Sequence, residues 1–165
     1  GFEKNFYFSH MLNCVYDCSY CFLQGMFNSA NYLVFVNYED YFKEIEKIIK
    51  TNTNNRICFF SGYDCDSLAL DYLTNFVTNF VDFFSRYQNA FLEIRTKSVN
   101  IKPLFKFKPS KNIIIAYSIN PQSVIEKFEE KTPNFEKRLN ALKKIQEKGW
   151  NIGCLLYTTD AADES

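Results

Sequence analysis

Three of the six cysteines in this chain lie close together in the stretch "NCVYDCSYCFLQ". Cys14, Cys18 and Cys21 form a C-x3-C-x2-C loop, whereas a structural zinc ion needs four ligands. Three thiolates on a tight loop can instead hold three irons of a four-iron four-sulfur cluster and leave the fourth iron open to an outside ligand. The spacing therefore favours an iron–sulfur cluster. Two alternatives stay open: zinc with a fourth ligand from Cys65 or His10, and a redox pair of Cys18 and Cys21.

The composition indicates a globular domain with no strong charge preference. The chain has 165 residues, of which 47% are hydrophobic, and its 19 basic residues balance 19 acidic ones. This balance gives no general attraction to nucleic acid or to an anionic membrane. No apolar run approaches the roughly 18 residues of a membrane span, and the first residues lack a secretion signal. We therefore expect a cytoplasmic protein without membrane contact, whose clustered cysteines bind metal or react rather than form disulfides.

Segments with strand-like composition alternate with segments of helical periodicity. The expected strands cover residues 5–12, 32–36, 56–60, 90–96, 112–119 and 150–157. The expected helices cover roughly 37–50 and 67–86, followed by one opened by Asn120–Pro121 and one opened by Thr132–Pro133 and closed by Gly149. Such alternation predicts an α/β fold made of βαβ units with a parallel sheet, of which four units are visible and a fifth begins.

The residues that could do chemistry follow the expected strands. The cysteine loop, Ser61–Gly62, residues 95–97 and residues 118–120 each come after a strand-like segment. Because the carboxyl ends of parallel strands meet at one edge of a sheet, we expect these residues to lie near one another.

Beyond this pattern, the cysteine motif with Tyr20 before its last cysteine resembles the signature of radical S-adenosylmethionine enzymes. Four segments, in order, are similar to the spore photoproduct lyase family: "CVYDCSYCFLQ", "YDCDSLALDYLT", "RTKSVNIKPL" and "YSINPQSVIEKFEEKTPNFEKRLNALKKIQEKGWNIG". The resemblance implies a partial TIM-like (β/α)6 barrel, present here as its first four to five β/α units. It makes residues 1–153 a fragment of the radical S-adenosylmethionine core and residues 154–165 an atypical or non-native tail.

The resemblance also implies cofactors and the residues that bind them. A four-iron four-sulfur cluster would be held by Cys14, Cys18 and Cys21, with S-adenosylmethionine on the open iron. An electron donor such as flavodoxin or ferredoxin would reduce the cluster, and cleavage of the cofactor would give a 5′-deoxyadenosyl radical. The residues implied to seat S-adenosylmethionine are Tyr20, Ser61, Gly62, Lys97, Ser118 and Asn120. Helix capping by Ser118 or Asn120, and a solvated charge at Lys97, are the alternatives.

The family's reaction on DNA implies one more catalytic residue. Family members that repair the thymine photoproduct use a cysteine near the end of the second strand as a hydrogen donor. Cys65 lies close to that point, although alignment places Tyr63 there instead, and Phe22 replaces a tyrosine of the family's radical relay. The sequence thus predicts a radical lyase that acts on DNA. A family enzyme with a non-DNA substrate and a non-catalytic zinc protein are the alternatives.

Overall fold

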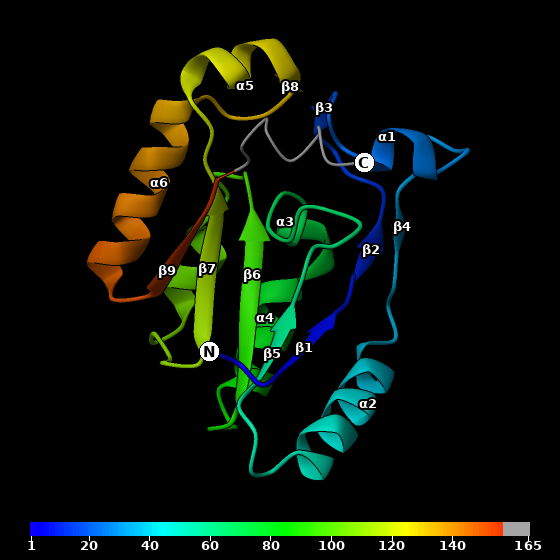
Figure 1. Cartoon of the computed structure of the whole chain (residues 1–165), viewed down its shortest axis with the longest axis vertical. Helices are drawn as coiled ribbons and strands as arrows, with labels where there is room; N and C mark the ends of the chain where they lie inside the picture. The colour runs from blue at the N-terminus through cyan, green and yellow to red at the C-terminus, as the bar shows by residue number, and fades with distance from the viewer. Residues whose placement is uncertain (157–165) are drawn as a thin grey trace.

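The computed structural model describes residues 1–156 and contains a five-stranded parallel sheet (Figure 1). The strands lie in the order β1-β5-β6-β7-β9, and every neighbouring pair is parallel. Their bounds are Lys4–Tyr7, Ile57–Phe60, Ala90–Thr96, Ile113–Ser118 and Asn151–Leu155. The alternation of strands and helices predicted from the sequence, and the α/β class, are therefore confirmed. All five carboxyl ends lie at the same edge of the sheet.

One face of the sheet carries the hydrophobic core. Helices α2 (Tyr38–Thr51), α4 (Phe76–Phe84) and α6 (Phe135–Lys148) contribute apolar side chains to it. Alternate strand residues point toward them, as expected for the two-residue period of a strand. Buried core residues of the strands include Ile57, Phe59, Leu92, Ile94, Ile113, Ile115 and Tyr117. The core thus packs the strands together, and their carboxyl ends lie at one edge of the sheet, beyond the core.

Short elements at the carboxyl edge surround the cysteine loop. Strands β2 (Met11–Leu12) and β4 (Leu33–Val34) form one antiparallel pair, and β3 (Asp17–Cys18) pairs with β8 (Glu129–Glu130). Helices α1 (Leu23–Met26), α3 (Asp71–Thr74) and α5 (Gln122–Phe128), and the 3-10 turn η1 (Lys102–Lys106), complete the fold. In Figure 1 the elements α1, β3, α3, α5 and β8 gather around this end of the sheet.

The single helix predicted over residues 67–86 is wrong, because two helices occupy this segment. They are separated at Asn75, whose φ of 52° is left-handed. Asp71 is buried, and its carboxylate accepts a 2.7 Å hydrogen bond from the Val77 N–H at the start of α4. Asp71 thereby satisfies an N–H that the first turn of a helix leaves unpaired, so α4 begins afresh.

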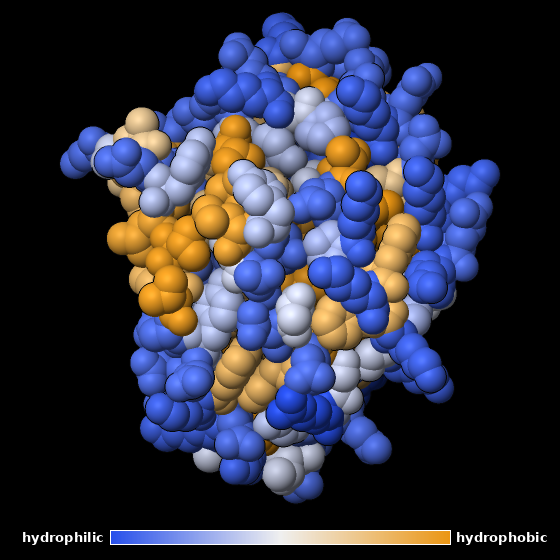
Figure 2. All heavy atoms as spheres, turned by 180° about the vertical axis from the view of Figure 1, so that it is seen from behind, coloured by the Kyte–Doolittle hydropathy of each residue, from blue (hydrophilic) through white to orange (hydrophobic). Residues whose placement is uncertain are grey.

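The first strand predicted over residues 5–12 also differs from the structure. Strand β1 ends at Tyr7, so His10 lies between β1 and β2 rather than at a strand end, although it is buried. The predicted strand at 32–36 is reduced to the two residues of β4, which lies outside the main sheet. Leu33 in β4 and Val36 just after it are exposed. Figure 2 shows hydrophobic residues gathered on the side of the molecule that carries β2 and β4.

Helix α2 begins after Asn37 and helix α6 ends at Gly149, as predicted, but α6 begins at Phe135 rather than at the predicted opening Thr132–Pro133. Asn37 precedes α2, yet its amide donates to Asp40 Oδ2 instead of accepting a backbone N–H. Helix α6 is capped by Asn134, which accepts from the Lys137 N–H, and it ends at Gly149 with a φ of 97°. This left-handed C-terminal residue is the conformation that favours glycine.

Two further expectations concern membrane-spanning helices and the C-terminal tail. Within residues 1–156, the helices are too short or too polar to cross a lipid bilayer. Of the predicted tail at 154–165, Cys154 and Leu155 belong to β9, and residues 157–165 lie outside the described part of the chain.

Candidate functional site

The cysteine loop is built from tight local turns. The Cys21 N–H donates to the Cys18 carbonyl at 2.9 Å, which closes the turn between the second and third cysteines. At the start of the loop, Asn13 has a left-handed φ of 74°, a conformation that asparagine tolerates better than most residues. Its side chain accepts from the Cys14 N–H at 3.0 Å and donates to the Ser29 carbonyl. Asn13 therefore fixes the backbone of the first cysteine.

The three cysteines of this loop line one pocket of about 200 Å³, which we call the cysteine pocket. It lies at the carboxyl ends of β5, β6 and β7, as the sequence predicted. Of the residues singled out from the sequence, its walls contain Cys14, Cys18, Cys21, Gly62, Cys65, Lys97 and Ser118. Phe22 and Tyr63 also line it, and their ring centroids are 5.5 Å apart. The fold thus brings together side chains from four separate segments.

Three predicted residues stand beside the cysteine pocket rather than in its walls. The Tyr20 ring lies 5.7 Å from the Lys97 ammonium, and its hydroxyl reaches Glu129. Asn120 is buried, and its amide also donates to Glu129, so it does not cap α5. Ser61 is fully buried and bonds to the Ser67 hydroxyl and the Glu93 carbonyl. The roles of these three residues in cofactor binding stay predictions.

Burial controls the thiols of the cysteine pocket. It raises the pKa of Cys14 to about 12, with a further rise from the nearby Asp66 carboxylate. Burial also raises the pKa of Cys18, and the Lys97 ammonium opposes that rise. The pKa of Cys65 is raised well above its usual range, again chiefly by burial. In the protein alone these groups are therefore protonated thiols, and binding of metal to them releases protons.

Cys65 has one further polar neighbour, His10. The Cys65 sulfur lies 3.9 Å from His10 Nδ1, and the imidazole stacks on Phe76 with ring centroids 4.2 Å apart. Burial lowers the pKa of His10 to about 3, so the ring is neutral at physiological pH. A neutral imidazole does not stabilise a thiolate as an imidazolium would. Cys65 is thus a protonated thiol and not a nucleophile activated by His10.

Asp66 is a functional candidate that the sequence interpretation missed. Its buried carboxylate accepts from the Thr96 hydroxyl at 2.8 Å and from the Lys97 N–H at 2.7 Å. It also accepts from the N–H groups of Leu68 and Ala69. Burial raises the pKa of this carboxyl, and these hydrogen bonds oppose the rise. Asp66 thereby joins the loop after β5 to the end of β6, where Lys97 enters the pocket.

A second missed feature is a buried ion pair between Glu129 and Arg138. Both side chains have an exposed fraction of 0%, and Arg138 Nη2 donates to Glu129 Oε2. The other carboxylate oxygen accepts from the Tyr20 hydroxyl at 2.5 Å and from the Asn120 amide at 2.6 Å. Arg138 Nη1 also donates to the Ser118 carbonyl at 3.1 Å. The pair therefore contacts three of the residues implied to seat the cofactor.

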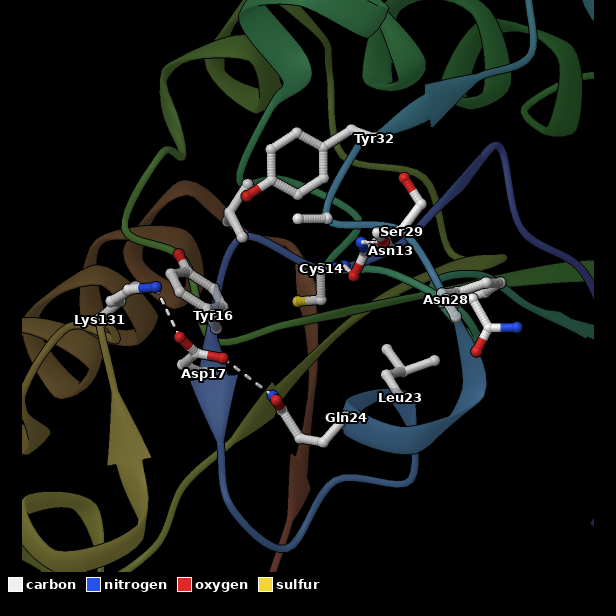
Figure 3. Close-up of a pocket in the computed structure, with 13 residues that line it drawn as sticks. Asn13, Cys14, Tyr16, Asp17, Leu23, Gln24, Asn28, Ser29, Tyr32 and Lys131 are labelled. Atoms are coloured by element: carbon white, nitrogen blue, oxygen red, sulfur yellow. Dashed lines mark hydrogen bonds and ion pairs between the residues drawn. The ribbon is translucent and has the colours of Figure 1, made fainter.

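The cysteine loop also borders a larger pocket on its other side, of about 430 Å³ (Figure 3). Cys14, Tyr16 and Leu23 line both pockets. In this outer pocket Asp17 lies between Lys131, at 2.5 Å, and the Gln24 amide, at 3.1 Å. Part of its lining belongs to the cysteine motif itself, but the rest comes from Lys131 and from residues between 27 and 32, where the sequence shows no motif.

The donor set of the cysteine pocket suits an iron–sulfur cluster. Thiolates are the ligands by which proteins hold such clusters, each on its own iron, and the three cysteines here share one pocket beside a lysine. Within residues 1–156, no three His, Cys, Asp or Glu side chains are arranged to hold a single metal ion. Fold and site together define a protein of the radical S-adenosylmethionine class.

Comparison with known proteins identifies the family. The sequence model of the spore photoproduct lyase family matches residues 6–163. The chain belongs to the spore photoproduct lyase family. The spore photoproduct lyase of Geobacillus sp. is 28% identical over 141 residues, which cover 85% of this chain and 41% of that protein. The Bacillus subtilis enzyme is 26% identical, with 87% of this chain and 42% of that protein covered.

Solved structures of spore photoproduct lyase share the fold. One, a mutant with bound AdoMet and dinucleoside spore photoproduct, superposes with a TM-score of 0.83 at 26% identity, covering 88% of this chain and 43% of its own. Another, complexed with dinucleoside spore photoproduct, gives a TM-score of 0.84 and covers 92% of this chain and 46% of its own. The chain thus spans less than half the length of these relatives, as expected for part of the barrel.

Proposed function

We propose that the cysteine pocket binds a four-iron four-sulfur cluster and S-adenosylmethionine. The observation that carries this proposal is the convergence of Cys14, Cys18 and Cys21 with Lys97 and Ser118 in one pocket at the strand ends. When bound and reduced by an external one-electron donor such as flavodoxin or ferredoxin, this pair of cofactors supplies a 5′-deoxyadenosyl radical. The protein's part is to bind, to orient and to exclude water.

The chain's own residues divide this work. The three thiols ligate the cluster as thiolates, and the positive charge of the Lys97 ammonium lowers the pKa of two of them, Cys14 and Cys18. The same ammonium suits a carboxylate such as that of the methionyl group. Gly62 also lines the pocket, and it takes a left-handed φ of 72° where a Cβ would collide with Ser67. Ser118, the last residue of β7, lines the same pocket.

The first test is anaerobic reconstitution of the chain with iron and sulfide. We expect about four irons and four sulfides per chain, a reduced cluster visible by electron paramagnetic resonance, and 5′-deoxyadenosine after reduction in the presence of S-adenosylmethionine. A chain that takes up zinc and no sulfide would instead support a structural metal protein. Because the relatives are more than twice as long, the cluster and the binding of S-adenosylmethionine are measured before turnover.

For the substrate, we propose the thymine photoproduct of DNA, with Cys65 as hydrogen donor. The support is the family, the two solved structures of relatives with bound dinucleoside spore photoproduct, and the protonated Cys65 thiol inside the pocket. The test is incubation of the reduced enzyme with DNA that contains the photoproduct, and the expected result is restored thymine. Loss of this repair in Cys65→Ala, with 5′-deoxyadenosine formation retained, would assign the hydrogen donor.

A family enzyme with another substrate is the second candidate. Phe22 and Tyr63 both line the pocket. They stand where the family's repair enzymes have a relay tyrosine and a hydrogen-donor cysteine, respectively. Formation of 5′-deoxyadenosine without any restored thymine would favour this candidate. We propose the cytoplasm as the place of either reaction, because thiols that hold a cluster must stay reduced.

A further inference from the structure

The cysteine loop and the end of β7 are joined through one buried ion pair. Glu129 Oε1 accepts from the Tyr20 hydroxyl, which comes from a residue 109 positions earlier in the chain, at 2.5 Å. The same oxygen accepts from the Asn120 amide at 2.6 Å, and Asn120 lies two residues beyond β7. The backbone of Glu129 pairs with that of Cys18 in the β3–β8 ladder. Glu129 therefore touches both segments that frame the cysteine pocket.

Arg138 completes this arrangement from α6. Besides Glu129, its guanidinium donates to the Pro133 carbonyl at 2.7 Å, the Thr132 hydroxyl at 2.6 Å and the Ser118 carbonyl at 3.1 Å. The carboxylate and the guanidinium are thus both fully buried and well supplied with partners. The fork-like geometry of the guanidinium lets the Arg138 side chain hold several fixed acceptors, which a lysine ammonium does less well.

The contacts continue from the ion pair to the pocket. The Tyr20 hydroxyl is held by Glu129, and the Tyr20 ring lies under the Lys97 ammonium, 5.7 Å from ring centroid to Nζ. Lys97 lines the cysteine pocket, as does Ser118, whose carbonyl is held by Arg138. Removing two ions from water is costly, and a well-packed apolar pair often stabilises a fold as well or better. The pair's contacts point to a role beyond stability.

We propose that Glu129 and Arg138 are positioning residues for S-adenosylmethionine. They fix Tyr20, Asn120 and the Ser118 carbonyl in one arrangement, so that the wall formed by Lys97 and Ser118 has its binding geometry before the cofactor arrives. This inference rests on the proposed function, because it assumes that the cysteine pocket holds the cluster and S-adenosylmethionine. It assigns no contact between either residue and the cofactor.

The decisive variant is Glu129→Gln in the reconstituted chain. Glutamine replaces one of the two carboxylate oxygens by an NH2 group, which is a donor. Either Tyr20 and Asn120, or Arg138, therefore lose their acceptor. Since hydrogen bonds to charged groups are strong, we expect the dissociation constant of S-adenosylmethionine to rise about tenfold or more. Iron content and the spectrum of the reduced cluster without S-adenosylmethionine should stay as in the unmodified chain, whereas the spectral change on adding it should require higher concentrations.

Two further variants keep the test decisive if Glu129→Gln folds poorly. The double variant Glu129→Gln with Arg138→Met removes both charges, so it should fold. We expect it to bind S-adenosylmethionine more weakly than the unmodified chain does. Tyr20→Phe removes only the hydroxyl that reaches Glu129, from a residue that is 43% exposed. Its effect and that of Glu129→Gln should not add, because both break the same contact.

The matched control is Lys131→Ala. Lys131, the residue after β8, pairs with Asp17 of β3, and both side chains are exposed. This variant loosens the same ladder without touching Glu129, so the affinity for S-adenosylmethionine should not change. Wild-type affinity in both Tyr20→Phe and whichever Glu129 variant folds would overturn the proposal. If the unmodified chain itself binds neither cluster nor S-adenosylmethionine, the proposed function fails instead, and the two failures are thereby distinguished.

Discussion

The carboxylate of Asp66 holds the backbone of Lys97 at the end of β6, through a 2.7 Å bond from the Lys97 N–H to Oδ2. Its other oxygen accepts from the Thr96 hydroxyl and from two N–H groups of its own loop. One buried side chain therefore sets where the pocket's lysine leaves the sheet. The sequence places Lys97 at a strand end, but this contact determines the direction of its backbone there.

This relationship predicts the effect of Asp66→Asn. The asparagine amide would place a donor against donors, which leaves at least one buried group without a partner and costs about 1–3 kcal/mol of unfolding free energy. We also expect weaker binding of S-adenosylmethionine to the reconstituted chain, because Lys97 loses its anchor. Urea unfolding and equilibrium binding measure the two effects. Asp82→Asn is the control: Asp82 forms an exposed ion pair with Arg86, so it should change stability by less than about 1 kcal/mol.

A second prediction concerns the stability of variants at Gly62, which lines the cysteine pocket. Its φ is 72°, and a Cβ built on it would lie 2.5 Å from Ser67 Oγ and 3.0 Å from the Cys65 carbonyl oxygen. Gly62→Ala should therefore lower the free energy of unfolding by at least about 1–2 kcal/mol through the left-handed backbone alone. Thermal unfolding measures the loss. Gly25→Ala is the matched control, because a Cβ there meets nothing within 4 Å; equal losses in the two variants would contradict the steric explanation.

Much of this architecture follows from local pattern. The apolar alternation of Ala90–Thr96 gives a strand with the bounds expected from the sequence, and the convergence of Cys14, Lys97 and Ser118 follows from the parallel sheet. The helix break at Asn75 does not follow from periodicity, since the apolar positions continue across it. It depends on the buried carboxylate of Asp71, whose partner Val77 lies six residues away.

The positioning residues were harder to find from sequence because charged side chains usually indicate a solvated surface. Arg138 does carry a signal, since it lies three residues before Ala141 and seven before Ile145, on the buried face of α6. A charge on an apolar helix face requires a buried partner. Only the fold identifies that partner as Glu129, because the turn between α5 and α6 brings the two together. Asp66 gives no comparable signal, as it lies in a loop.

A third prediction concerns the three cysteines that we propose as cluster ligands. Replacing Cys14, Cys18 or Cys21 singly by alanine should abolish most cluster formation, because two thiolates cannot hold three irons. Iron and acid-labile sulfide per chain, measured after anaerobic reconstitution, test this. Cys154→Ala is the control, because Cys154 is exposed and is not part of the cysteine pocket. Iron content that falls equally in Cys154→Ala would mean that metal binds the thiols without specificity.

The lowered pKa of His10 gives a prediction of how the stability of the fold depends on pH. Burial lowers its pKa in the folded protein to about 3, whereas in the unfolded chain the pKa is about 6.5. Between these values the unfolded chain binds a proton that the folded protein does not, so stability falls as the pH falls below about 6.5. From pH 7 to pH 5 this group alone should cost about 2 kcal/mol of unfolding free energy. Denaturant unfolding at the two pH values, compared with His10→Gln, isolates the contribution. The variant is expected to lose this part of the pH dependence, and an equal slope in both proteins would show that His10 is not the group responsible.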